Sequence, residues 1–110
     1  MAGEAIAVDV DLELQPGVDT RAPGGAVTVE LCGHWEHDGP CRWPHNSRID
    51  VDASPVRLRT IVVVSDDDRS DVVRRVEAAL RRDDRWTLAR FSVRPVADEE
   101  RELALRLARG

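Results

Sequence analysis

The sequence predicts an α+β domain, with a mainly antiparallel sheet of four to five strands and two helices packed on one face. Three observations predict this class. Several segments alternate between apolar and polar residues, one long segment carries a helical apolar stripe, and groups of proline and glycine separate them. Because 110 residues suffice for one hydrophobic core, we expect a single domain over residues 1–110.

The first third of the chain is predicted as two strands with a break between them. Residues 5–14 alternate strictly and place acids on one face, which is typical of a half-buried antiparallel strand. Residues 15–25 contain two prolines and three glycines, and we expect a loop there. A second strand is expected over 26–34, with three apolar residues facing inward: Val27, Val29 and Leu31.

The remaining elements follow from the same patterns. Alternation predicts a strand over 48–53, and a β-branched run predicts a strand covered on both faces over 56–64. An apolar stripe, with acids before it and arginines at its end, predicts a helix over 69–82. Residues 86–93 are expected to form a further strand. Residues 98–109 are rich in Glu, Arg, Leu and Ala, and this composition favours a terminal helix over a hairpin strand.

Chemically reactive residues gather in one segment. All three histidines, both cysteines and two of the three tryptophans lie between Cys32 and His45, within the spacing Cys-x-His-x2-His-x3-Cys-x3-His. Thiolate and imidazole are the ligands that Zn²⁺ prefers, and four of them close a structural site. The predicted ligand set comprises Cys32, His34, Cys41 and His45, with His37 as the substitute.

Three other interpretations of this segment stay open. Cys32 and Cys41 could form a disulfide, which a cytoplasmic location disfavours. They could also be small buried residues beside polar loop histidines. A catalytic site would use Cys41, or a metal-bound water, with His37 as general base. We expect Trp35 and Trp43 to pack over the end of the sheet and hold the segment.

Composition narrows the classes of partner. The chain holds 21 acidic and 16 basic residues, for a net charge of -5, and this balance disfavours nucleic-acid binding. No apolar run is long enough for a membrane helix, and the N-terminus lacks the features of a secretory signal, so we expect a cytoplasmic domain. The arginines that follow residue 69 are expected to form a solvated helix face and to pair with Asp71 and Glu77. Asp66, Asp67 and Asp68 favour the start of a helix over a Mg²⁺ site.

The sequence thus favours a binding or interaction module whose segment 32–45 holds a structural zinc ion. A metal-free homodimer that acts through protein contacts is the first alternative. A small zinc- or cysteine-dependent enzyme is the second.

Overall fold

The computed structural model describes residues 4–32 and 43–108, with Cys32 described by its backbone alone. Four antiparallel strands form one sheet in the order β2-β3-β1-β4. The strands are β1 (Glu4–Leu14), β2 (His45–Asp50), β3 (Val56–Val64) and β4 (Trp86–Pro95). The helical elements are α1 (Ala22–Cys32), α2 (Asp66–Arg81), the 3₁₀ turn η1 (Asp98–Glu100) and α3 (Arg101–Ala108). The α+β class and the antiparallel sheet are therefore confirmed.

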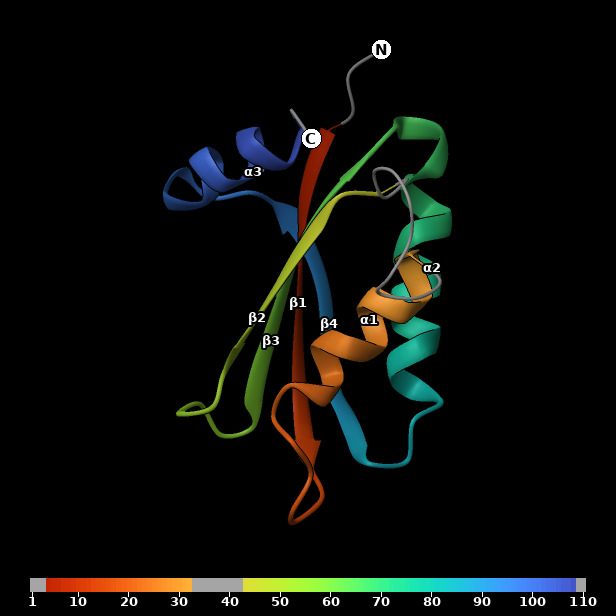
Figure 1. Cartoon of the computed structure of the whole chain (residues 1–110), viewed down its shortest axis with the longest axis vertical. Helices are drawn as coiled ribbons and strands as arrows, with labels where there is room; N and C mark the ends of the chain where they lie inside the picture. The colour runs from red at the N-terminus through yellow and green to blue at the C-terminus, as the bar shows by residue number, and fades with distance from the viewer. Residues whose placement is uncertain (1–3, 33–42, 109–110) are drawn as a thin grey trace.

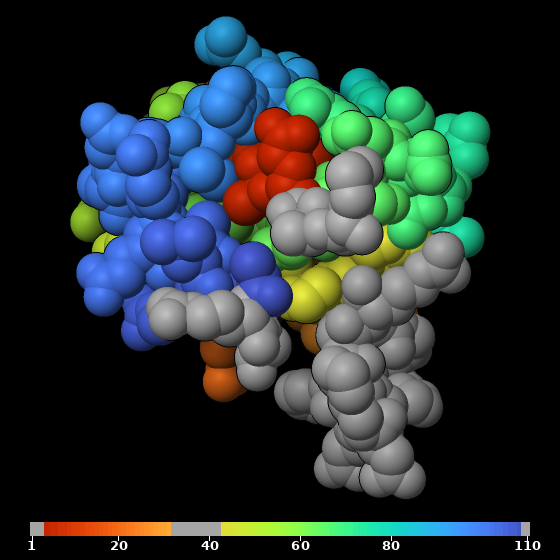
Figure 2. Space-filling model, turned by 90° about the horizontal axis from the view of Figure 1, so that it is seen from above, coloured from red at the N-terminus to blue at the C-terminus, as the bar shows by residue number. Residues whose placement is uncertain are grey.

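The order of elements gives a split β-α-β topology. β1, α1 and β2 form a crossover, β3 returns between β1 and β2, and α2 leads to β4 at the opposite edge. This β-α-β-β-α-β arrangement is called ferredoxin-like. α1 and α2 lie on one side of the sheet and α3 lies on the other (Figure 1). Viewed from above, α3 and the start of α2 flank opposite sides of the N-terminal end of β1 (Figure 2).

The strand predicted over 26–34 is wrong, because this stretch belongs to α1. Val27 and Leu31 are buried while Val29 between them is 53% exposed. Burial therefore recurs every four residues, as expected for one face of a helix. The strand prediction arose because Val27, Val29 and Leu31 also stand at every second position. Pro23 lies in the first turn, where its missing N–H costs no helical hydrogen bond. The predicted loop over 15–25 correspondingly ends sooner, since α1 begins at Ala22.

β4 contains an irregularity that reverses its alternation. Its register against β1 shifts between Asp11 and Leu12, so one extra residue, Ala89, stands on the β4 side. Trp86 and Phe91, which strict alternation would place on opposite faces, therefore contact the same core beneath α1 and α2. The indole Nε1 of Trp86 donates to the carbonyl of Leu80 at 2.9 Å. This bond ties the start of β4 to the end of α2.

Two apolar clusters hold the sheet between its helices. The larger cluster fills the space under α1 and α2, with fourteen buried residues that include Val8, Val27 and Val76. The smaller one lies under α3 and consists of Ala7, Ile61 and Ala104. The terminal helix thus covers only one end of the second sheet face. No helix within residues 4–32 and 43–108 is long and apolar enough to cross a membrane.

Candidate functional site

His45 is the one predicted metal ligand whose side chain the structure describes. It is the first residue of β2 and is half-buried on the side of the sheet that faces α1. Its Nδ1 lies 3.1 Å from the carbonyl oxygen of Trp43, and its Nε2 lies 3.1 Å from the hydroxyl of Thr28 in α1. The first contact is local and the second joins β2 to α1, so both ring nitrogens are engaged and the imidazole has a fixed orientation.

These contacts define the tautomer of the imidazole. A carbonyl oxygen only accepts, so Nδ1 carries the hydrogen and donates it to Trp43. Burial lowers the pKa of His45, with a smaller opposing effect from the Trp43 carbonyl, so the ring is neutral at pH 7. Nε2 then holds the lone pair and faces the Thr28 hydroxyl as an acceptor. This is the arrangement of a histidine that ligates a metal, whose second ring nitrogen donates to a carbonyl or carboxylate.

The hydroxyl of Thr28 has a second acceptor. Its Oγ1 also lies 3.1 Å from the carbonyl oxygen of Gly24, one turn earlier in α1. A hydroxyl carries one hydrogen, so Thr28 donates either to Gly24 or to His45. A ligand that bound Nε2 of His45 would leave the Thr28 hydroxyl satisfied by Gly24.

The structure brings together the two ends of the cysteine- and histidine-rich segment. Cys32 is the last residue of α1, one turn beyond Thr28, and His45 begins β2. The Thr28–His45 contact therefore places the end of α1 beside the start of β2. The expectation that Cys32 lies on a strand is wrong, because it ends a helix. The predicted ligands His34, His37 and Cys41, with Trp35, lie outside the described residues.

Trp43 fixes the chain where it enters β2. It is 6% exposed and belongs to the larger apolar cluster, which confirms the packing role predicted for it. Its indole Nε1 donates to Asp68 in the first turn of α2 at 3.1 Å, and the guanidinium of Arg75 lies 5.4 Å from its ring centre. Glu30 of α1 pairs with Arg75 at 3.8 Å and with Arg82 at 2.6 Å. Trp43 is therefore held by α2, which is itself tied to α1.

A small cleft lies between α1 and β2 beside His45. It has a volume of about 340 Å³ and is lined by polar groups that include Thr28, His45 and Ser47. The hydroxyl of Ser47 bonds Thr60 at 2.8 Å, so it is not the partner of the imidazole. The hydroxyl in the cleft that contacts the imidazole is that of Thr28, which also contacts the Gly24 carbonyl. The catalytic candidates Cys41 and His37 lie outside the described residues.

Several charged groups of α2 form structural pairs with one another. Arg74 and Arg75 bond Asp71 at 2.7 and 3.0 Å, and Arg81 pairs with Glu77 at 2.9 Å, as predicted for a solvated helix face. Ser65 caps α2 by accepting from the Asp68 amide at 3.3 Å, and three acids occupy the first turn. Within the described parts of the chain, no group of three or more His, Cys, Asp or Glu side chains could hold a metal ion.

The residues that sequence reasoning missed are Thr28 and Asp68. Thr28 was expected on a strand, so its position beside His45 had no signal in the sequence. Asp68 is one of three consecutive aspartates, and only the packing of Trp43 distinguishes it from the others.

No family model, no curated protein and no solved structure matches this chain.

Proposed function

We propose that this chain is a cytoplasmic binding domain whose segment 32–45 is ordered by one structural zinc ion. The ligands are drawn from Cys32, His34, His37, Cys41 and His45. The observation that carries the proposal is the geometry of His45. Its Nδ1 hydrogen is bonded to a carbonyl, its ring is neutral, and its Nε2 lies beside the helix that ends at Cys32.

The position of the segment supports the same proposal. Its ends leave α1 and enter β2 side by side, and Trp43 anchors one of them in the core. Zinc at this point would connect the crossover helix to an edge strand, so metal binding would add directly to folding free energy. In a reducing compartment both cysteines remain available as thiolate ligands.

Metal analysis of the full chain tests the proposal. Protein purified without added metal should contain about one zinc ion per chain, and a chelator should lower its Tm by about 10 °C or more. His45→Ala and Cys41→Ser should each reduce the zinc content. Asn46→Ala is the matched control, because Asn46 is the exposed neighbour of His45 and its side chain lies on the other side of β2. This control should retain its zinc.

Cobalt substitution provides a second measurement that does not depend on stability. Co²⁺ bound by the cysteines should give an intense thiolate absorption band, and Cys32→Ser or Cys41→Ser should weaken it. Protein without zinc, with no cobalt band and with an unchanged Tm in chelator, would exclude the zinc site.

A metal-free homodimer is the second candidate, and the edge of β4 favours it. Among the described strands β4 pairs only with β1, so one side of this ten-residue strand has no strand partner there. Phe91 and Val93 beside that edge are only half-buried. Pairing of β4 with its copy would extend the sheet and cover both residues. Sedimentation equilibrium should then show a dimer at micromolar concentration, and a monomer at all concentrations would exclude it.

A further inference from the structure

The second face of the sheet, on which α3 lies, also carries a hollow. Its volume is about 640 Å³, and side chains from all four strands line it. Four of them are arginines: Arg48, Arg57, Arg59 and Arg94. The other charged side chains of the lining are aspartates, so the hollow contains both guanidinium donors and carboxylate acceptors. None of these residues belongs to the zinc proposal, which concerns the opposite side of the sheet.

Two of the arginines form a like-charged pair across neighbouring strands. Arg48 of β2 and Arg59 of β3 are direct partners in the antiparallel register, so their side chains leave the same face of the sheet. Side chains in such a pair have Cβ atoms about 5 Å apart, and like charges at this position are destabilising. The next pair on this face has opposite charges, since Asp50 of β2 lies across from Arg57 of β3. An anion placed between Arg48 and Arg59 would remove their repulsion.

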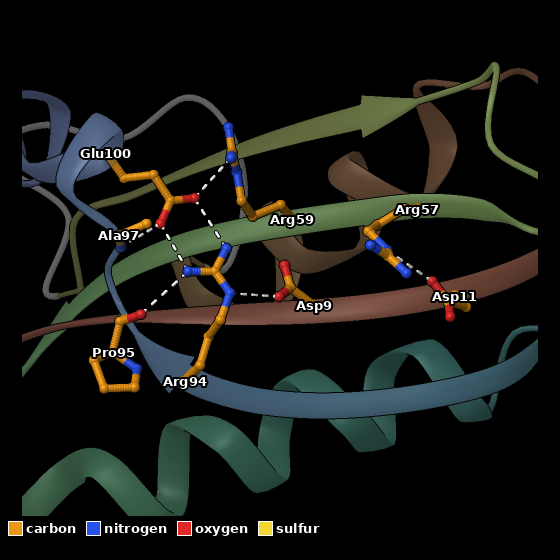
Figure 3. A network of polar contacts seen from close by, with 8 residues as sticks. All are labelled: Asp9, Asp11, Arg57, Arg59, Arg94, Pro95, Ala97 and Glu100. Carbon is orange, nitrogen blue, oxygen red and sulfur yellow. Dashed lines mark hydrogen bonds and ion pairs between the residues drawn. The ribbon is translucent and has the colours of Figure 1, made fainter.

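The two arginines differ in what already holds them. Arg59 pairs with the buried carboxylate of Glu100 at 2.7 Å and is largely covered, with 28% of its side chain exposed. Figure 3 shows Glu100 between Arg59 and Arg94, and Arg94 also contacts Asp9 at 2.6 Å. The side chain of Arg48 is exposed and makes no hydrogen bond or ion pair with any other described residue. One guanidinium is therefore fixed in place and the other is available.

We propose that Arg48 and Arg59 bind the anionic group, a phosphate or a carboxylate, of a small ligand in this hollow. A guanidinium presents its N–H groups as a fixed planar fork that matches both anions. The acids Asp9, Asp50 and Asp52 surround the pair, and the whole chain has a net charge of -5. These negative charges favour one compact anion over a polyanion such as a nucleic acid.

Titration of the full chain with small anions tests this site. Sodium phosphate and sodium acetate are added in separate NMR titrations at constant ionic strength, with sodium chloride as the reference salt. Saturable shifts of the Arg48 and Arg59 side-chain signals with phosphate or acetate are the expected result. The two titrations distinguish the ligand sources, because a phosphate ester would be recognised through phosphate and an organic acid through the carboxylate of acetate.

Two matched variants give the decisive comparison. Arg48→Gln should weaken the binding of the anion about tenfold or more, as expected for loss of a charge-assisted hydrogen bond. Arg90→Gln is the control, because Arg90 is an exposed arginine of β4 on the same face that lies outside the hollow. Its side chain likewise forms no ion pair with the described residues. Equal weakening in both variants, or shifts no larger than those caused by chloride, would overturn the proposal. Unchanged folding of both variants is checked by their amide spectra.

Discussion

At the scale of single residues, Glu100 is a buried carboxylate whose charge is balanced by arginines. It is 3% exposed, yet its carboxylate accepts from Arg94 at 2.8 and 3.1 Å and from the Ala97 amide at 2.7 Å. The hydrogen bonds from Arg94 are the main reason that the pKa of Glu100 is lowered to about 2, and the pKa of Arg94 is raised in return. Such pairing offsets the cost of burying a charge.

Glu100 should therefore make the stability of the fold depend on pH. Its folded pKa lies below the ordinary value of 4.5, so its contribution is complete above about pH 4.5 and is lost as the pH falls towards 2. Glu100→Gln should lower the free energy of unfolding by about 3 kcal/mol at pH 7. Urea unfolding at several pH values measures this, and the gap between the two proteins should shrink between pH 4.5 and 2.

A neighbouring glutamate provides the control for this measurement. Glu102 lies two residues further on, is exposed, and forms no ion pair within the described part of the chain. Glu102→Gln should change the free energy of unfolding by less than about 0.5 kcal/mol. A Glu100→Gln protein as stable as the Glu102→Gln protein at pH 7 would show that the carboxylate charge is dispensable.

At the scale of elements, α1 is where the sequence and the structure differ most. β1, β3, α2, β4 and the terminal helix lie within a few residues of their predicted bounds. Periodicity predicted β1 and α2, a β-branched run predicted β3, and composition predicted the terminal helix. α1 has two glycines, a proline and several β-branched residues, a composition that does not favour a helix. Its short apolar pattern fits an alternating strand and a helix with one buried face equally well. Its helical form is set by the crossover from β1 to β2, which is a tertiary constraint.

The candidate sites also depend on tertiary structure that the sequence pattern does not define. A cluster of cysteine and histidine is visible in the sequence, but the neighbour of His45 is Thr28, 17 residues away on an element whose type was predicted wrongly. The Arg48–Arg59 pair depends on the register of β2 against β3, which alternation alone does not define. Glu100 was equally hidden, because it follows two further acids that are exposed.

The glycines of α1 leave room for a stabilising change. A Cβ added at Gly25 would meet no atom within 4 Å, and the residue lies inside a helix, where glycine is less favourable than alanine. Gly25→Ala should therefore raise the free energy of unfolding by about 0.5–1 kcal/mol, measured by urea unfolding.

Gly17 is the contrasting position. Its φ is +83°, in the left-handed region, so an alanine there is strained although the space around it is open. Gly17→Ala should lower the free energy of unfolding by about 1 kcal/mol. A gain in stability from both substitutions would show that the loop before α1 adjusts its backbone, and a loss from both would place an unfavourable contact at Gly25.

At the scale of the whole molecule, the sheet divides the apolar core into two unequal parts. The cluster under α1 and α2 has fourteen buried residues, whereas the cluster under α3 has three. α3 is eight residues long, too short to be stable as an isolated helix. Its attachment depends on Ala104 against the sheet and on the ion pairs of Glu100 just before it. α3 is therefore expected to open without unfolding of the remaining structure.

Native-state hydrogen exchange measures this difference. Amides of α3 should exchange on the order of 100-fold faster than amides of β1 and β3, because local opening requires less free energy than global unfolding. Ala104→Asp places a charge in the small cluster and should remove the remaining protection of α3 while the strands keep theirs. Leu105→Asp makes the same change at the next residue, which is 56% exposed, and should have little effect on α3. Simultaneous loss of protection in α3 and in β1 would instead show that both faces of the sheet unfold as one unit.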